Sequence, residues 1–424
     1  MQSVTTGSRS LAQRPASTLA VLTGVNAFNY LDRFITAPLL PLIIASLHLS
    51  DAQAGSLQTM FILVYSLACP LTGWLGDRIR RLHIAAAGVA VWSLATFTSG
   101  LAVSFAWLAL ARAVVGIGEA SYTVVTPSLL SDHYPPARRG RALSIFYAAM
   151  PVGIAFGYVL GSQIGARFGW RPAFFVAGGP GLALACALLF LREPPRGRFD
   201  QESKPTATLG ETVQALGKRP SFFFNMAGQT IFTFAMGGLG TWMPTYFVRE
   251  RGLGVGAAGT IFGALLLVAG FVGTIAGGQL GDRLARRFPG AHFSFSGWSL
   301  VASVPFTLLA VLSPVPALFW PAMFVTLLLS FVNMGPLNAA MVNVLPPDLR
   351  SRGIGLHTTT IHLLGDALSP FLIGVVSDSV GLRIPVLVTG LFLPIAGLVL
   401  LIGRRYLVAD LAARPLPPCP PSQG

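Results

Sequence analysis

Charge is scarce in this chain of 424 residues. Asp, Glu, Lys and Arg together make up 10% of it, whereas an average soluble domain contains about 25%. Hydrophobic residues make up 53% and the mean hydropathy is +0.67. So few charged groups cannot cover a globular surface with solvated side chains, so the composition excludes a soluble protein. It indicates a protein that crosses a membrane many times.

Cysteine and enzyme motifs are also scarce. The three cysteines, Cys69, Cys186 and Cys419, are odd in number and widely spaced, so neither a disulfide framework nor a zinc site is implied. The chain contains no H-E-x-x-H, G-x-S-x-G, Walker or dinucleotide-binding motif. We therefore expect no enzyme, no ATP-driven pump, no metal and no organic cofactor. A passive channel or lipid scramblase is an alternative that would differ by lacking a proton requirement.

Basic residues are in excess, but they do not indicate a nucleic-acid partner. The formal net charge is +14 and the sequence pI is about 10.8. A nucleic-acid site needs basic side chains gathered on one solvated face, whereas here they lie between apolar runs. Their placement is better explained by membrane orientation.

Twelve apolar runs are long enough to cross a hydrocarbon core of about 30 Å. Six precede a charged, proline-containing segment and six follow it. The sequence therefore predicts an all-α membrane protein with twelve transmembrane helices in two pseudo-symmetric halves of six. The expected parts are residues 1–191 for the first half, 192–219 for a cytoplasmic linker, 220–406 for the second half and 407–424 for a disordered tail.

The distribution of Lys and Arg predicts the orientation, because cytoplasmic loops hold most of them. If the N-terminus is cytoplasmic, the opposite loops hold only Arg167, Arg171, Arg249, Arg251 and Arg383 of the 29 Lys and Arg residues. Arg33 and Arg112 fall inside spans, and all the others lie on the cytoplasmic side. We expect both termini to be cytoplasmic.

An internal repeat supports the two-half plan. The string GWLGDRIRR, from Gly73, recurs as GQLGDRLAR, from Gly278, 205 positions later. A second echo, PPARRGRA from Pro135 against PPDLRSRG from Pro346, follows the fourth span of each half. Parallel six-helix repeats are a transporter plan in which the substrate site lies near mid-membrane between the halves.

The repeated G-x-L-G-D-R motif resembles the hallmark of the major facilitator superfamily, although Arg80 stands where the usual pattern has glycine. Within that superfamily the chain resembles the spinster family. The strings that carry this resemblance are NYLDR (29–33), GDRIRR (76–81), ARAVVGIGEASY (111–122), FGYVLGS (156–162) and HLLGDALSP (362–370). They are scattered over both halves, so the resemblance covers nearly the whole chain.

The resemblance implies a function. Spinster proteins export lysolipids and sphingoid phosphates, and bacterial relatives are proposed to be proton-driven. It implies a proton-coupled antiporter that works by alternating access in a bacterial inner membrane, most simply as a monomer, and exports a lysophospholipid or sphingolipid-like amphipath. Its energy source would be a proton gradient. The alternatives keep the fold: a proton-coupled multidrug exporter or a symporter of a small organic anion.

Four charged residues in the first and fourth spans are the candidate coupling site. An ionisable side chain at mid-membrane costs about 2.5–3.5 kcal/mol, so such residues pair and face cavities. Asp32 and Arg33 are neighbours in span 1, and Arg112 and Glu119 lie two helical turns apart in span 4. Asp32 pairs with Arg112 and Arg33 with Glu119, or the reverse. The resemblance assigns proton coupling to Asp32 and Glu119, while the arginines poise these acids or bind a substrate anion; a static structural network is the alternative.

Further polar residues are candidates for the substrate cavity and for a second proton site. Those expected near the cavity are Asn29, Tyr30, Tyr122, Asn225, Gln229 and Thr233, with ordinary helix packing as the alternative for each. His362 and Asp366 lie one helical turn apart in span 11. A pair of this kind can carry protons near neutral pH or be purely structural, so it is a secondary candidate.

The repeated motif is the candidate gate. Its charged residues are Asp77, Arg78 and Arg81 in the first half and Asp282, Arg283 and Arg286 in the second. We expect each aspartate either to cap a helix N-terminus or to pair with an arginine across the interface between the halves when the cytoplasmic side is closed.

Overall fold

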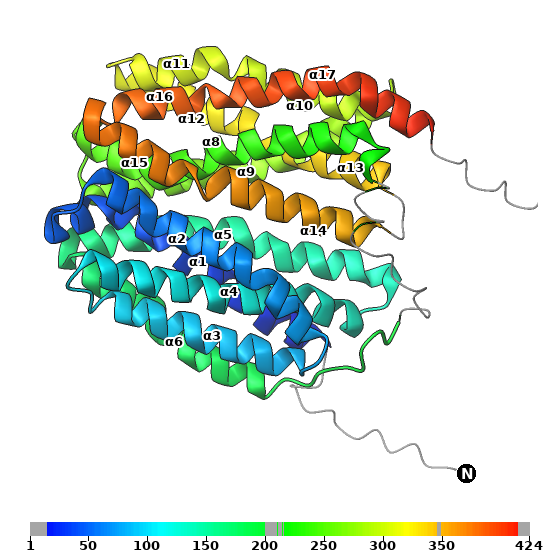
Figure 1. Cartoon of the computed structure of the whole chain (residues 1–424). Helices are drawn as coiled ribbons and strands as arrows, with labels where there is room; N and C mark the ends of the chain where they lie inside the picture. The colour runs from blue at the N-terminus through cyan, green and yellow to red at the C-terminus, as the bar shows by residue number, and fades with distance from the viewer. Residues whose placement is uncertain (1–14, 200–209, 211–213, 215, 346–348, 414–424) are drawn as a thin grey trace, which may run out of the picture. The chain divides into compact units, whose positions relative to one another are not determined.

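The computed structural model describes residues 15–199, 210, 214, 216–345 and 349–413. Most of these residues are helical (Figure 1). The first half contains α1 (Pro15–Leu47), α2 (Asp51–Gly76), α3 (Arg81–Ser99), α4 (Phe105–His133), α5 (Pro136–Phe168) and α6 (Trp170–Leu189). The second contains α8 (Pro220–Arg251), α9 (Val255–Ala285), α10 (Ala291–Ala302), α11 (Val304–Leu312), α12 (Pro316–Phe331), α13 (Met334–Val344), α14 (Arg350–Ile361), η2 (His362–Asp366), α15 (Ser369–Val380), α16 (Arg383–Gly390) and α17 (Phe392–Ala412).

The helices account for the predicted twelve transmembrane segments in two sets of six. Within the described residues, eleven helical segments are long and apolar enough to cross a membrane. The twelfth is α8, whose 32 residues reach the length of a span but include the polar Asn225, Gln229, Thr230 and Thr233. The predicted all-α fold class is confirmed.

Several spans of the second half are interrupted, which their apolar composition did not indicate. Span 9 divides between α10 and α11 at Ser303, where Pro305 stands in the first turn of α11. Proline lacks an N–H donor and is favoured in the first turn of a helix, which matches the start of a new helix there. Span 11 contains the π-helical segment η2 between α14 and α15.

The described chain forms two compact units that do not coincide with the two sequence halves. Among the described residues, one unit comprises 15–199, 236–268 and 362–389, and the other comprises 210, 214, 216–235, 269–345, 349–361 and 390–413. The first unit therefore also contains one end of several helices from the second half. α17 continues to Ala412, so residues 407–412, expected in a disordered tail, are helical, and residues 414–424 of that tail lie outside the described residues. Leu216, expected in the linker, packs with Phe222 and Met341.

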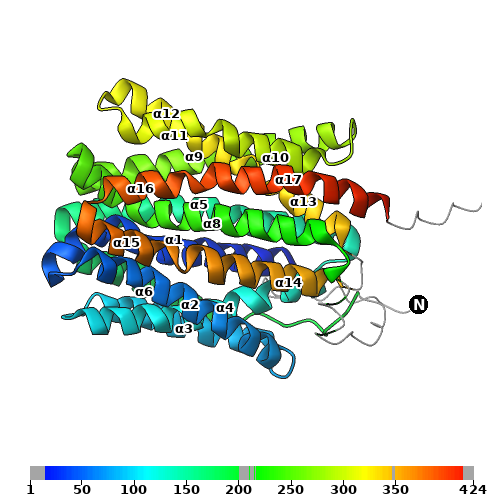
Figure 2. The same cartoon turned by 45° about the horizontal axis from the view of Figure 1, so that its top comes forward.

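In the first unit, close glycine contacts hold α1 in place. α1 packs on α5, α2 on α4, and α3 on both α4 and α6 (Figures 1 and 2). A Cβ added at Gly157 of α5 would lie 2.6 Å from the carbonyl oxygen of Leu31, and one at Gly153 would collide with that of Ala27. Small residues at such crossings let helix backbones approach. They fix the part of α1 that contains Asp32 and Arg33.

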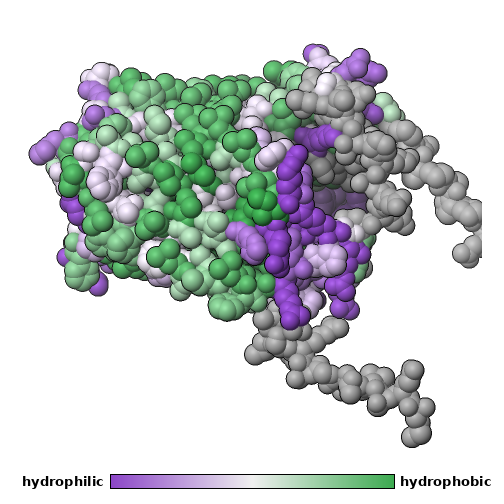
Figure 3. All heavy atoms as spheres, turned by 60° about the horizontal axis from the view of Figure 1, so that its bottom comes forward, coloured by the Kyte–Doolittle hydropathy of each residue, from purple (hydrophilic) through white to green (hydrophobic). Residues whose placement is uncertain are grey.

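In the second unit, α10 packs on α17 and α11 on α12 (Figure 2). Large apolar side chains are exposed on both units, including Phe190 of the first at 77% and Trp298 of the second at 62%. The face in Figure 3 shows apolar side chains over its middle and hydrophilic ones toward its ends. Exposed apolar surface of this extent is what a lipid-embedded protein presents.

Candidate functional site

Arg33 and Glu119 form a buried ion pair between α1 and α4. The Nε and Nη2 of Arg33 lie 2.9 and 2.8 Å from Oε2 of Glu119. Their side chains are 13% and 0% exposed. Of the pairing that joins Asp32 to Arg112 and Arg33 to Glu119, the structure therefore contains the second part, whereas no direct bond joins Asp32 to Arg112 among the described residues. Such a pair satisfies two charges that would be costly to leave alone away from water.

Asp32 has a different kind of partner. Its Oδ2 accepts a 2.7 Å hydrogen bond from the hydroxyl of Thr96 on α3, and both residues are 0% exposed. Its Oδ1 has no hydrogen-bond partner among the described residues. The two carboxylates thus differ: Glu119 is held by a guanidinium and Asp32 by a neutral hydroxyl.

Arg112 acts on both carboxylates without a direct hydrogen bond to either. It is 0% exposed, and none of its guanidinium nitrogens has a hydrogen-bond partner among the described residues. Its guanidinium lies 4.9 Å from the ring centre of Phe61, and its charge acts on both Asp32 and Glu119. With all four groups ionised, the network of Asp32, Arg33, Arg112 and Glu119 is neutral. We call these four residues the charged network.

Three aromatic rings lie close to the guanidinium of Arg33 in the charged network. Tyr30, Phe61 and Tyr65 lie 5.3, 5.1 and 4.6 Å from the guanidinium carbon of Arg33. Cation–π contacts of this kind stabilise a desolvated arginine by about 2 kcal/mol. Asn29 is 0% exposed and lies near Glu119. Asn29 and Tyr30 therefore border the charged network, and their role toward a substrate stays a prediction.

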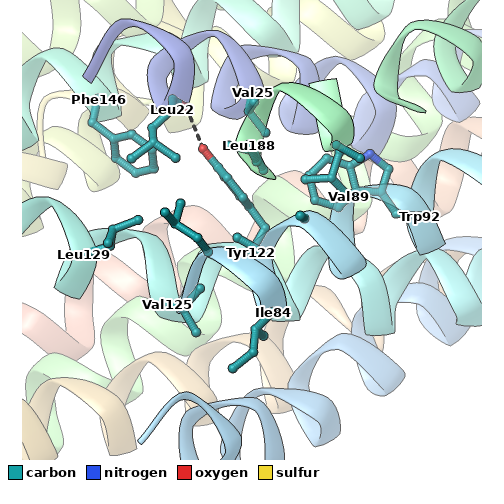
Figure 4. Packing of buried hydrophobic residues seen from close by; sticks show 14 of the residues in the cluster. Leu22, Val25, Ile84, Val89, Trp92, Tyr122, Val125, Leu129, Phe146 and Leu188 are labelled. Carbon is teal, nitrogen blue, oxygen red and sulfur yellow. Dashed lines mark hydrogen bonds between the residues drawn. The ribbon is translucent and has the colours of Figure 1, made fainter. Parts of the chain in front are cut away.

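Tyr122 occupies a packed apolar cluster. It is 0% exposed, its hydroxyl donates a 2.5 Å hydrogen bond to the carbonyl of Leu22, and its ring meets Trp92 edge-on at 5.6 Å (Figure 4). Phe146 and Val125 belong to the same cluster (Figure 4). In this structure Tyr122 ties α4 to α1 through core packing rather than facing an open cavity.

The expected cavity residues of α8 bond to each other and to α13. Gln229 donates a 2.7 Å hydrogen bond to Asn225, which donates one of 2.9 Å to the carbonyl of Leu337. Asn225 is 1% exposed, and Thr233 is half-buried on the same helix. These bonds match the helix-packing alternative, and substrate contact by Asn225, Gln229 and Thr233 stays a prediction.

His362 and Asp366 do meet, on an unusual backbone. Nδ1 of His362 lies 3.0 Å from Oδ2 of Asp366, at opposite ends of the π-helical η2. Isolated π-helical turns often mark functional positions. On α8, Gly237 faces this turn, because a Cβ there would collide with Cβ of Asp366.

The first copy of the repeated motif is organised around Arg81. Its side chain, 7% exposed, lies 2.6 Å from Asp132 of α4 and 2.9 Å from Glu193, which follows α6. Burial raises the pKa of Glu193, but hydrogen bonds from the Arg81 side chain and from the backbone of Arg81 and Leu82 outweigh it and leave that pKa below its usual range. Arg81 and Asp132 also line a cavity of about 570 Å³ at this end of the unit.

Neither aspartate of the repeated motif caps a helix N-terminus, contrary to one of the two sequence expectations. Asp77 follows the last residue of α2, and the next helix begins after Arg80 without a side-chain cap. Asp77 accepts a bond from Arg196 through its carbonyl, and Arg78 lies 3.9 Å from the ring centre of Trp74. Asp282 lies inside α9, 3.8 Å from Nε2 of His292, and exposed Arg283 and Arg286 flank the end of that helix.

One cluster at the opposite end of the first unit was not predicted. Asp51 accepts hydrogen bonds from Arg249 of α8, at 2.7 and 2.9 Å, and from Ser377 of α15, at 2.6 Å. Asp378 of α15 accepts from the backbone N–H groups of Asp51 and Ala52, at the start of α2. The partners of Asp51 lie 198 or more residues away in the chain. The local sequence therefore indicates only an acidic residue in the first turn of a helix. We call Asp51, Arg249, Ser377 and Asp378 the α2–α15 latch.

Comparison with known proteins places this arrangement in a class. Residues 22–370 match the Major Facilitator Superfamily. In structure, the chain is similar to a bacterial homologue of the human lysosomal transporter Spinster, in an inward-facing and unoccupied conformation, with a TM-score of 0.87 and 26% identity, covering 95% of this chain and 99% of the other. It also shares its fold with the nucleoside transporter NupG, with a TM-score of 0.70 at 12% identity, covering 93% of this chain and 99% of that one.

The fold and the charged network buried in its spans define a membrane transporter of the major facilitator superfamily. In sequence, the chain is 35% identical over 380 residues to protein spinster homolog 1 of Xenopus tropicalis, covering 85% of this chain and 72% of that one. It is 35% identical over 390 residues to protein spinster homolog 1 of Homo sapiens, covering 86% and 73%. Within the superfamily, the chain belongs to the spinster family.

Proposed function

We propose that this transporter couples inward proton movement to the export of an amphipathic lipid-like molecule, a lysophospholipid or a sphingolipid-like amphipath. Transport proceeds by alternating access, with Asp32 and Glu119 as the proton-binding groups. In this proposal both termini are cytoplasmic, the membrane is a bacterial inner membrane, and the protein acts as a monomer without a cofactor.

The observation that carries the proposal is the unequal bonding of the two buried carboxylates. Glu119 is held directly by the charged guanidinium of Arg33, whereas Asp32 is held by the neutral hydroxyl of Thr96. Arg112 acts on both carboxylates and is bonded to neither. A small movement of Arg112 would favour ionisation of one carboxylate at the expense of the other, because a nearby opposite charge stabilises the ionised form. A carrier needs an acid whose proton affinity changes between states.

The α2–α15 latch supports alternating access. It joins α2 of the first sequence half to α8 and α15 of the second through charged hydrogen bonds. With the N-terminus cytoplasmic, this end of the helices faces away from the cytoplasm. Closure of that side by breakable polar bonds is what a rocking carrier needs in a state open to the cytoplasm.

The surroundings of the arginines bear on the cargo. Arg112 is 0% exposed and the Arg33 side chain 13%, under three aromatic rings. Arginines meant to capture a small hydrated anion would line an open polar cavity, so this burial favours an amphipath over an organic anion symporter. A multidrug exporter would use the same coupling site, so only transport assays distinguish this alternative from a lipid exporter.

The test is transport of a fluorescent lysophospholipid by purified protein in liposomes, with and without an imposed pH gradient. We expect the gradient to accelerate movement of the lipid in the parent. A cationic dye and a dicarboxylate are assayed in the same way, as test substrates for the multidrug exporter and for the organic anion symporter. Lipid movement that ignores the gradient would overturn proton coupling, whereas gradient-driven movement of only the dye or the dicarboxylate would overturn the lipid cargo.

A further inference from the structure

We propose that Thr96 is a positioning residue for proton coupling: its hydroxyl holds Asp32 in place through both the ionised and the protonated state. The proposal rests on the function proposed above, because it assigns Asp32 a changing charge. It concerns a residue of α3, a helix that contributes no charged group to the network.

The geometry sets Thr96 apart from its neighbours on α3. Hydroxyls in membrane helices commonly bond to the carbonyl one turn earlier, and Thr98 and Ser99 do so, both to the carbonyl of Ala95. Thr96 instead bonds across to another helix, 2.7 Å from Oδ2 of Asp32 and 64 residues away in sequence. α3 packs mainly on α4 and α6, so this bond is not a by-product of tight packing against α1.

A hydroxyl suits a carboxyl group that changes protonation state. It has one O–H donor and two acceptor lone pairs, so it can donate to the carboxylate and accept from the carboxylic acid by rotating its proton. An arginine has donors only, so it could not accept a hydrogen bond from the carboxylic acid. Thr96 can therefore keep Asp32 in one position while the proton is bound or released, which leaves Arg112 free to respond to charge alone.

The other groups that face Asp32 are few. Arg112 and Glu119 of α4 act on it, as does Arg33 of α1. The arginines of α5 and α6 lie within the first six or the last two residues of those helices, away from the middle of the bundle. Removing the Thr96 hydroxyl therefore removes a specific donor and leaves every charge around Asp32 in place.

The experiment follows the carboxyl infrared band that disappears in Asp32→Asn, as pH is varied, in purified protein. Thr96→Val is expected to move the midpoint of that band by about one unit toward higher pH, because the ionised carboxylate loses a charge-assisted hydrogen bond. Thr96→Ser should keep the parent midpoint, and Thr96→Cys, a weaker donor, should give an intermediate shift. Thr326→Val is the matched control, since its buried hydroxyl bonds only to Ala322 of its own helix.

The same variants are then assayed for transport at a series of pH values. A shifted pH optimum in Thr96→Val, with the parent optimum in Thr96→Ser and Thr326→Val, supports the proposal. An infrared midpoint unmoved in both Thr96→Val and Thr96→Cys would overturn it, even if stability falls. If the infrared midpoint shifts while transport ignores pH in every variant, Thr96 positions Asp32 as proposed and the proton-coupled function is what fails.

Discussion

Arg249, near the end of α8, donates two hydrogen bonds of 2.7 and 2.9 Å to the two carboxylate oxygens of Asp51, the first residue of α2. The two residues belong to different sequence halves of the transporter. A planar guanidinium matches a carboxylate in this two-point geometry, which makes the pair stronger and more directional than a lysine would. The bond therefore favours the state in which these ends of the halves are together.

Arg249→Ala is expected to open this end of the protein. Loss of charge-assisted bonds of about 1–3 kcal/mol would raise the open-to-closed ratio by about 5–150-fold. Spin labels at Ala45 and Ser379, both exposed near the latch, should show a longer distance population in the variant. Glu250→Gln, at the exposed neighbouring position, is the control. Identical distance distributions in Arg249→Ala and the parent would show that the latch does not set this equilibrium.

The same closure depends on two glycines. A Cβ at Gly55 of α2 would collide with the carbonyl oxygen of Pro370, and one at Gly374 of α15 would collide with that of Asp51. Gly374→Ala should therefore reduce transport by a factor of ten or more by preventing close packing of α2 on α15. Gly24→Ala is the matched control, because nothing lies within 4 Å of a Cβ there. Parent-like transport in Gly374→Ala would mean that this contact is not needed.

Replacing one partner of the ion pair between Arg33 and Glu119 should reduce the stability of the fold more than replacing both partners does. Arg33→Met leaves a buried carboxylate without its partner, at a cost of about 3–5 kcal/mol. The double variant Arg33→Met with Glu119→Gln should lose less stability than the sum of the losses in the two single variants, by about 1 kcal/mol or more. Thermal unfolding in detergent measures the stability of Arg33→Met, Glu119→Gln and the double variant. Arg78→Met is the control for losing an exposed arginine. Additive losses would contradict a direct pair.

Glu193 should make stability depend on pH. Its pKa is lower in the folded protein than the value of about 4.3 in an unfolded chain. A depressed folded pKa contributes stability that is present above the unfolded pKa and lost as pH falls through the folded one. Glu193→Gln should therefore lower the unfolding temperature near neutral pH, and the gap to the parent should narrow below about pH 4. A gap that stays constant with pH would contradict the role of its charge.

The membrane fold and the charged network could be predicted because both leave a strong mark on a sequence. Twelve apolar runs and a repeated motif need no knowledge of packing. Charges in a span are so costly that Asp32, Arg33, Arg112 and Glu119 are conspicuous. The seven-residue spacing of Arg112 and Glu119 places them on one helix face, and both are buried beside α1 in the structure.

The remaining partners could not be predicted, for physical reasons. A threonine in a membrane helix usually bonds to its own backbone, so Thr96 carries no signal that separates it from Thr98. Asp51 and Arg249 lie at helix ends, where charges are ordinary, and only the tertiary fold brings them together. Of the two roles expected for Asp77 and Asp282, the N-terminal cap was wrong because each aspartate lies at the end of one helix and not before the first turn of the next. Pairing with an arginine between the halves stays a prediction.

The central claim is that Asp32 couples proton movement to transport. It is tested most directly by measuring proton flux and substrate flux together in the parent and in Asp32→Asn. Protein in liposomes that contain a pH-sensitive dye is given its substrate on one side, and proton flux is recorded together with substrate flux. Coupling through the charged network predicts that the parent moves protons with substrate, whereas Asp32→Asn exchanges substrate across the membrane without moving protons. Proton flux that accompanies substrate equally in the parent and in Asp32→Asn would contradict the account.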